Sequence, residues 1–207
     1  MKYIYKTRWW MKIFYPSLIW EVKTSKKEIF LTFDDGPDPE ITPWVLDQLK
    51  KHNAKATFFC VGENVEKHPN LFKRIQEEGH SIGNHTYSHK NGWHTDCKNY
   101  IINIKKCSHI FDSKIFRPPH GRITKKQIKK IKPEYKIIMW SLLSGDFDPK
   151  ISATECAYNT VQYSKPGSII VFHDSQKSKE KLYEALPKIL NHFSSTKWEM
   201  NQLETVL

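Results

Sequence analysis

Three separated segments of the chain carry side chains that could together form a hydrolytic metal site. Residues 32–37 (TFDDGP) offer two adjacent carboxylates at the end of an apolar run, and residues 85–89 (HTYSH) offer two imidazoles. Residues 172–174 (FHD) add a third histidine. Two imidazoles and one carboxylate leave an open coordination position on an ion such as Zn²⁺, as in catalytic rather than structural sites. The remaining carboxylate and histidine would serve as base and acid.

The spacing of the two histidines, His85 and His89, predicts that both lie on one side of a helical turn. The residues alone leave two alternatives open. Asp34, Asp35 and Gly36 could form only a β-turn, and with ten histidines in the chain an i, i+4 pair can arise by chance. The position of the pair, directly after a short strand-like run, favours a functional site.

Residues 117–121 (RPPHG), 140–147 and 167–174 extend this pattern along the chain. Together the segments resemble, in the same order, the signature segments of the polysaccharide deacetylases, which are the NodB-homology proteins of carbohydrate esterase family 4. The resemblance covers residues 32–174, most of the chain. A lone Asp-Asp-Gly-Pro would be a weak signal, whereas the ordered set is specific.

This resemblance implies a hydrolase that removes N-acetyl groups from an N-acetylglucosamine-containing polysaccharide or oligosaccharide, such as a peptidoglycan- or chitin-like polymer of a bacterial cell wall. Asp35, His85 and His89 would hold one divalent metal ion, and Asp34 would be the base that takes a proton from the attacking water. We expect Zn²⁺ first, because imidazole and carboxylate ligands suit it, with Co²⁺, Ni²⁺ and Mn²⁺ as alternatives.

The segment around Arg117 would support the base and the developing oxyanion. Arg117 would pair with Asp34 and keep it ionised, although a surface salt bridge is the alternative. Pro118 and Pro119 would stiffen the loop so that the backbone N–H of His120 points at the oxyanion. The family usually has tyrosine at this position, but a backbone donor survives a change of side chain.

His173 is the candidate general acid, because a histidine can donate a proton near neutral pH when a carboxylate supports its protonated form. By resemblance Asp146 is that carboxylate, while Asp148 and Asp174 are alternatives.

Apolar side chains near these residues could form a pocket for the acetyl methyl group. Trp140 and Val171 are the candidates, and we expect Phe172 to belong to the core. Leu143 and Phe147 stand where the family has Asp and Trp, so this part of the chain departs from the family pattern.

Strand-like and helical patterns alternate beyond residue 27. Strands are expected over residues 28–33, 56–61, 81–83, 115–116, 135–140 and 168–172, and helices over residues 42–52, 70–78, 95–111, 125–131, 153–164 and 177–192. Such alternation predicts a parallel sheet with crossover helices and catalytic residues at the carboxyl ends of the strands. The resemblance implies a single-domain irregular (β/α) barrel of about seven or eight units, which periodicity alone does not separate from an open doubly wound sheet.

Composition is that of a globular protein, with 39% hydrophobic and 27% charged residues among 207, so we expect one domain. We also expect a monomer. The formal net charge of +11 could favour anionic partners, but the lysines are spread along the chain. Because the chain has no nucleic-acid-binding motif, we expect no such partner. Four cysteines without a CxxC pair favour a reducing compartment, and Cys60 is expected to be a buried thiol.

The N-terminal segment, residues 1–27, is basic and aromatic. Lys6, Arg8 and Lys12 precede the apolar residues 13–20, which Pro16 interrupts and which lack a signal-peptide cleavage pattern. This stretch is too short to span a bilayer. We expect it to pack on or near the barrel formed by residues 28–207, with peripheral contact to a membrane or the cell wall as the alternative. Both the cytoplasm and the cell envelope stay open as locations.

Two further functions fit the same residues. An O-acetyl esterase would use the same site to cleave an ester, and a non-catalytic carbohydrate-binding protein would keep the barrel without turnover. The complete set of site residues disfavours the second, whereas His120 and Leu143 keep it open.

Overall fold

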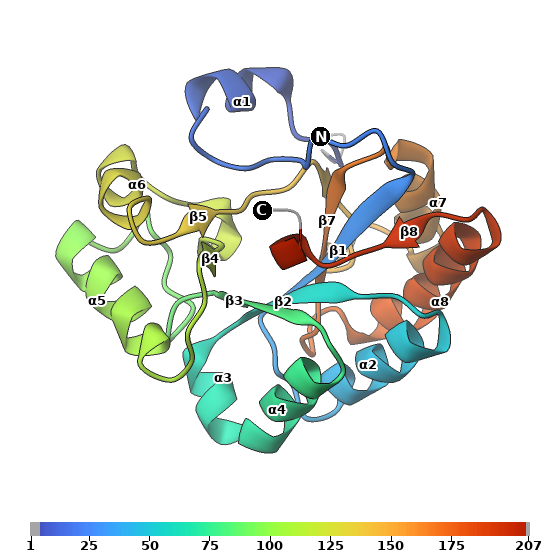
Figure 1. The fold of residues 1–207 in the computed structure, drawn as a ribbon, viewed down its shortest axis with the longest axis horizontal. Coiled ribbons are helices and arrows are strands. Elements are labelled where there is room, and N and C mark those ends of the chain that lie inside the picture. The colour runs from blue at the N-terminus through green and yellow to red at the C-terminus, as the bar shows by residue number, and fades with distance from the viewer. Residues whose placement is uncertain (1–4, 206–207) are drawn as a thin grey trace.

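A parallel sheet curled into a half-barrel forms the centre of the molecule, and helices cover its outer face (Figure 1). The computed structural model describes residues 5–205. The strands are β1 (Glu28–Asp34), β2 (Ala56–Cys60), β3 (Ser81–Asn84), β4 (Ile115–Phe116), β5 (Lys136–Ile137), β6 (Leu142–Leu143), β7 (Ser168–His173) and β8 (Glu199–Met200). Their order is β5-β4-β3-β2-β1-β7-β6, with β8 beside β1. The expected single-domain irregular barrel is confirmed.

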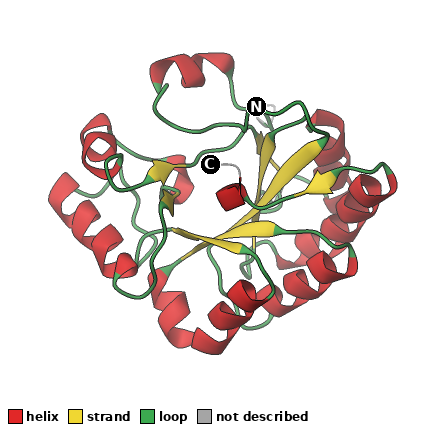
Figure 2. Ribbon diagram, viewed as in Figure 1, coloured by secondary structure: helices red, strands yellow, loops and turns green. Residues whose placement is uncertain are grey.

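Helices follow most strands and return the chain to the start of the next one (Figure 2). They are α1 (Trp9–Phe14), α2 (Ile41–Lys51), α3 (Gly62–Lys67), α4 (Pro69–Glu77), α5 (Cys97–Ser108), α6 (Lys125–Ile131), α7 (Ala153–Tyr163) and α8 (Lys179–Ser195), with 3₁₀ turns η1 (Pro119–Gly121) and η2 (Leu203–Thr205). Side-chain caps fix several starts, because a polar oxygen satisfies a free N–H of the first turn. Ser152 and Glu155, for example, form a reciprocal capping box at α7.

The central strands are buried on both faces, as parallel strands covered by helices must be. Every residue of β1 is buried. Phe33 stacks on Phe58 of β2 and Phe172 of β7, with ring centroids 5.1 and 5.6 Å apart. The register aligns Asp34 with His173 on the neighbouring strand. Packing therefore fixes the two strand ends that carry the candidate base and acid.

Residues 135–140 do not form the single strand that the apolar run predicts. Only Lys136 and Ile137 make β5, after which the chain pairs with the N-terminal segment. Ile19 N–H donates to Ile137 O at 2.9 Å, and Met139 N–H donates to Ile19 O at 2.7 Å. Two short helices, α1 and α3, carry no clear signal in the sequence, because each has only six residues, which is fewer than two turns.

The N-terminal segment spans the opening between the two end strands of the sheet. Tyr5 O accepts a hydrogen bond from Leu143 N of β6, while Ile19 bonds to β5. Leu18 and Trp20 of this segment are buried and belong to the hydrophobic core. The division of the chain into an N-terminal segment, residues 1–27, and a barrel, residues 28–207, stays a prediction. Residues 1–4 and 206–207 lie outside the part of the chain that the structure describes. Within residues 5–205, no helix has both the length and the apolar character needed to cross a membrane.

Candidate active site

The two adjacent carboxylates lie at the carboxyl end of β1 and line the same pocket. Asp34 is the last residue of the strand, and Asp35 has a φ of 83°. This left-handed conformation breaks the alternation of strand side chains and lets the second carboxylate turn toward the first. A hydrogen bond of 3.1 Å from Gly36 N–H to Asp174 Oδ1 holds this turn in place.

The two histidines lie on a loop after β3, so the expectation of a helical turn is wrong. Thr86 and His89 have positive φ values, 65° and 51°, and the loop is fixed by a hydrogen bond of 2.8 Å from Thr86 N to Asn84 Oδ1. These two left-handed residues curl the loop tightly enough to bring the His85 and His89 rings together, with centroids 5.1 Å apart. An irregular loop thus achieves the proximity that the i, i+4 spacing suggested.

The carboxylate and the two imidazoles form a cluster that fits a divalent cation. One ligand atom from each of Asp35, His85 and His89 lies within 4.8 Å of the others. Asp35 Oδ1 is 3.1 Å from His89 Nε2 and 3.7 Å from His85 Nε2. His85 Nδ1 is 2.8 Å from Arg117 O, which can only accept, so Nδ1 carries the proton and Nε2 keeps its lone pair.

Electrostatics favour the metal-binding protonation states of Asp35 and His85. Burial alone would raise the pKa of Asp35, but the hydrogen bond from His89 and the neighbouring imidazoles hold that pKa well below its usual range. Burial lowers the pKa of His85 to about 4, so this ring is neutral at physiological pH. A carboxylate and a neutral imidazole are the forms that bind a metal.

Arg117 is buried in full, which excludes the surface salt bridge considered above. Its Nη1 donates to Asp34 Oδ1 and to Thr32 Oγ1, both at 2.7 Å. Nη2 donates to Met139 O at 2.9 Å, and Nε to Ile138 O at 3.3 Å. Because the guanidinium is anchored both to β1 and to the segment after β5, it fixes the orientation of the Asp34 carboxylate.

His173 contacts Asp146, and the two alternative carboxylates are engaged elsewhere. Nδ1 of His173 lies 3.0 Å from Asp146 Oδ1. Burial alone would lower the pKa of His173, but the charge and hydrogen bond of Asp146 raise it to about 9. Asp174 accepts from Thr42 Oγ1 and Gly36, and Asp148 accepts from Lys150 N. Of the three, Asp146 therefore supports the protonated ring.

One cavity of about 340 Å³ collects most of the predicted site residues. Its lining comprises Asp34, Asp35, His85, His89, His120, Gly121, Trp140, Leu143, Phe147, Val171, His173, Ser175 and Lys177. Three predicted residues, Arg117, Pro119 and Asp146, lie buried outside this lining. Phe172 belongs to the core, as expected.

Two lining residues, Ser175 and Lys177, lie outside all the motif segments of the sequence. Ser175 Oγ lies 3.4 Å from Asp35 Oδ2, and Lys177 Nζ lies 5.9 Å from the centre of the Phe147 ring. Both follow β7 in a stretch of polar residues that carries no spacing signal. Only the path of the chain after the strand brings them to the pocket.

His120 occupies a tight turn at the rim of the pocket, with a φ of 59°. Its ring stands edge-on to that of His89, with centroids 4.6 Å apart. Partial burial and the neighbouring His89 lower the pKa of His120. Gly121 follows with a φ of 65°, and a Cβ there would overlap the Trp140 ring, so the turn and the pocket wall are packed together.

Comparison with known proteins agrees with this geometry. Residues 21–134 match the model of a family described as polysaccharide deacetylase. The chain belongs to the polysaccharide deacetylase family. The resemblance drawn from the sequence is therefore confirmed. A peptidoglycan-N-acetylglucosamine deacetylase from Bacillus cereus is 42% identical over 177 residues, which cover 80% of this chain and 64% of that protein.

Solved structures of similar proteins extend the likeness to nearly the whole chain. The crystal structure of a peptidoglycan N-acetylglucosamine deacetylase with a benzamide ligand has a TM-score of 0.85 at 36% identity, and the match covers 97% of both chains. A family 4 acetyl xylan esterase from Clostridium thermocellum, solved with a cobalt ion, has a TM-score of 0.79 at 29% identity. That match covers 86% of this chain and 89% of the esterase.

Proposed function

We propose that this polysaccharide deacetylase is a metal-dependent enzyme that removes N-acetyl groups from an N-acetylglucosamine-containing glycan of the peptidoglycan or chitin type. One observation carries the proposal. The cluster of Asp35, His85 and His89 lines a single pocket. The same pocket is lined by Asp34, which is bonded to Arg117, and by His173, which is bonded to Asp146. Amide hydrolysis needs these three functions side by side.

Asp35, His85 and His89 would hold the metal, with Zn²⁺ as our first choice and Co²⁺, Ni²⁺ or Mn²⁺ as alternatives. A divalent ion bound there would supply Lewis-acid polarisation of the acetyl carbonyl and would acidify water. The cobalt ion in the similar acetyl xylan esterase supports a metal at this kind of site. Ser175, which contacts Asp35, would help to orient that carboxylate.

Asp34 would act as the general base. Arg117 donates to its Oδ1, so Oδ2 is the oxygen that would take a proton from the attacking water. The buried guanidinium lies 2.7 Å from this carboxylate and holds it in one orientation. The His120 backbone N–H would donate to the oxyanion that develops on the acetyl carbonyl.

His173 would act as the general acid. Because Nδ1 is engaged by Asp146, Nε2 is the nitrogen that would protonate the leaving amine. A raised pKa keeps the ring protonated at neutral pH, when the amine must leave. Trp140 and Val171 would form the wall against which the acetyl methyl group packs.

The substrate class rests on the similar proteins together with the pocket. The Bacillus cereus relative is named a peptidoglycan-N-acetylglucosamine deacetylase, and so is the protein in the most extensively matched structure described above. O-acetyl esterase activity is a second candidate, favoured by the likeness to an acetyl xylan esterase. The same base and metal cluster would serve an ester, which has an easier leaving group.

Acetate release from a substrate panel tests the proposal. We expect the enzyme loaded with Zn²⁺ or Co²⁺ to release acetate from chitooligosaccharides or peptidoglycan, and to release less from acetylxylan. Asp34→Asn should lose about a hundredfold or more of this activity. Asp112→Asn, the same change at an exposed aspartate, should leave it intact. Release from acetylxylan alone would favour the esterase, and no release from any substrate would contradict both activities.

A further inference from the structure

The short helix α1 exposes four large apolar side chains. Trp9 is 73% exposed, Ile13 and Phe14 are each 63% exposed, and Trp10 is 41% exposed. The spacing pairs Trp9 with Ile13 and Trp10 with Phe14 on neighbouring lines of the helix surface. In the second pair the rings stand edge-on, with centroids 6.3 Å apart. The four side chains form one continuous apolar face. Figure 1 shows α1 at the periphery of the molecule.

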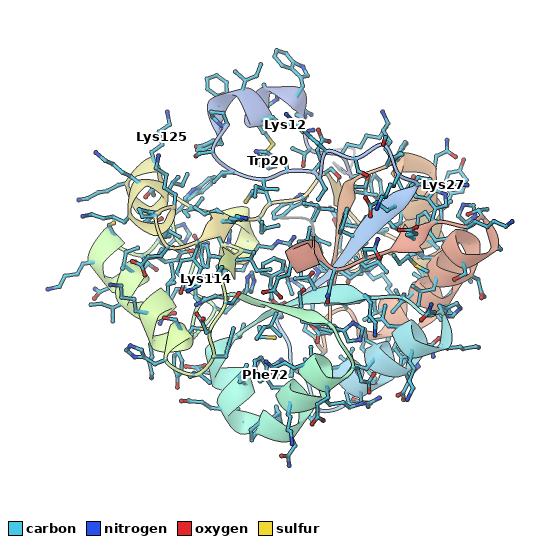
Figure 3. The ribbon with its side chains drawn as sticks, viewed as in Figure 1. Lys12, Trp20, Lys27, Phe72, Lys114 and Lys125 are labelled. Atoms are coloured by element: carbon cyan, nitrogen blue, oxygen red, sulfur yellow. The ribbon has the colours of Figure 1, made fainter. Side chains whose placement is uncertain are left out.

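The opposite side of α1 is firmly attached to the barrel. Met11 and Tyr15 pack against the hydrophobic cluster that contains Trp20. Trp20 Nε1 donates to Tyr15 O at 3.2 Å, and Lys12 Nζ lies 2.7 Å from a carboxylate oxygen of Glu21. Figure 3 shows Trp20 on the side of α1 that faces the barrel. The apolar face is therefore held outward by specific contacts.

A lysine-rich cavity of about 500 Å³ lies beside the attachment of this helix. Its lining includes Lys6, Lys12, Lys23 and Lys165, and among its described lining residues Glu21 is the one acid, which pairs with Lys12. Residues 5–27 together carry six basic side chains and one acidic side chain. The apolar face thus stands next to a strongly positive surface.

We propose that α1 and the adjacent lysine-rich cavity dock the protein on a membrane that contains anionic phospholipids. A helix with a Trp- and Phe-rich face and basic surroundings lies in the plane of the interface, with its rings at the level of the headgroups. Each basic residue near an anionic surface strengthens binding roughly fivefold. A second copy of the chain fits less well, because a symmetric contact would bring the two positive surfaces together.

This surface is separate from the candidate active site. The cavity is lined by Ser168 at the start of β7, whereas His173 lies at the other end of the same strand. Docking through α1 would leave the catalytic pocket unchanged. Membrane docking therefore does not depend on the proposed deacetylase activity, and either property could be absent without the other.

Vesicle co-sedimentation with the full chain tests the apolar face. We expect binding to vesicles of phosphatidylcholine with phosphatidylglycerol, and little binding to phosphatidylcholine alone. Ile13→Asp should weaken binding about tenfold or more, because it places a carboxylate in the interface. Ile102→Asp is the matched control, since Ile102 is 54% exposed on α5, and it should bind like the wild type. Both residues are exposed, so both variants should keep the melting temperature of the wild type.

A pair of charge reversals tests the lysine-rich cavity. Lys23→Glu should weaken binding to the anionic vesicles roughly tenfold, and added salt should reduce the difference. Lys51→Glu changes the net charge equally at the end of α2 and should have little effect. Equal losses for the two variants would show that net charge alone attracts the protein, and would overturn the assignment of a docking surface.

Three further results would also overturn the proposal. One is no binding to the anionic vesicles. Another is a dimer in solution that Ile13→Asp dissociates, which would assign the apolar face to a second copy. The third is displacement of the protein from vesicles by soluble glycerol phosphate at micromolar concentration, since the cavity would then bind free phosphate esters rather than a membrane.

Discussion

Asp146 holds His173 at two points. Its Oδ1 lies 3.0 Å from the ring Nδ1, and its Oδ2 accepts the backbone N–H of the same residue at 2.6 Å. Asp146 itself is buried in full. One carboxylate therefore sets both the position of the main chain and the orientation of the ring, and it does so from outside the pocket.

This relationship predicts an unusual titration of His173. Its pKa of about 9 lies above the ordinary value of about 6.5. The pair therefore contributes its full stability below about pH 6.5 and loses it as the pH rises through about 9. In the metal-free protein, NMR titration of the His173 ring should give a midpoint near pH 9. Asp146→Asn should lower the midpoint by about one pH unit or more. An unchanged midpoint in this variant would contradict the pairing.

The two adjacent carboxylates should respond differently to substitution. Asp34→Asn should keep the metal but lose most turnover, because the proposed base is removed while the proposed ligands remain. Asp35→Ala should instead lose metal affinity, since it deletes one of the three proposed protein ligands. Equilibrium dialysis with Zn²⁺ and acetate release measure the two effects. Loss of metal in the first variant and its retention in the second would reverse the assignment.

Arg117 should contribute strongly to the stability of the fold, in addition to fixing the Asp34 carboxylate in the site. Arg117→Met would leave Asp34 buried without its partner, so the free energy of unfolding should fall by about 3–5 kcal/mol at neutral pH. Adding Asp34→Asn should recover part of this loss, because it removes the uncompensated charge. Urea denaturation of the single and double variants provides the comparison. A loss below about 1 kcal/mol, as for an exposed pair, would contradict the buried contact.

His173 should matter more for an amide than for an activated ester. An amide nitrogen leaves only when protonated, whereas p-nitrophenolate leaves p-nitrophenyl acetate without help. His173→Ala should therefore lose roughly a hundredfold or more on an N-acetyl glycan and much less on the aryl ester. Asp34→Asn should be impaired on both, since both need an activated water. Equal losses for His173→Ala on the two substrates, at unchanged metal content, would point to a role in binding instead.

The sequence predicts which residues gather in the candidate site better than it predicts the backbone that positions them. The order of the motifs and their places at strand ends are visible in the residues, and the parallel register then brings Asp34 and His173 together. The i, i+4 spacing of His85 and His89 indicates a helical turn, whereas the structure has an irregular loop there. Its two left-handed residues, Thr86 and His89, are not glycines and carry no signal of a positive φ.

The periodicity of the sequence also does not predict which distant segments contact one another. The pairing of Ile19 with the chain after β5 splits an apolar run that reads as one strand. Ser175 and Lys177 reach the pocket only through the course of the chain after β7. Short-range patterns contain no information about such neighbours, because the contacts depend on the closure of the whole sheet.

The most direct test of the central claim is acetate release from an N-acetylglucosamine oligosaccharide before and after removal of metal. Exhaustive chelation should abolish the release, and Zn²⁺ or Co²⁺ added back should restore it to the wild-type enzyme. His89→Ala, which lacks one of the proposed ligands, should recover little at the same metal concentration. Full activity after chelation, with metal loss verified by elemental analysis, would contradict the account.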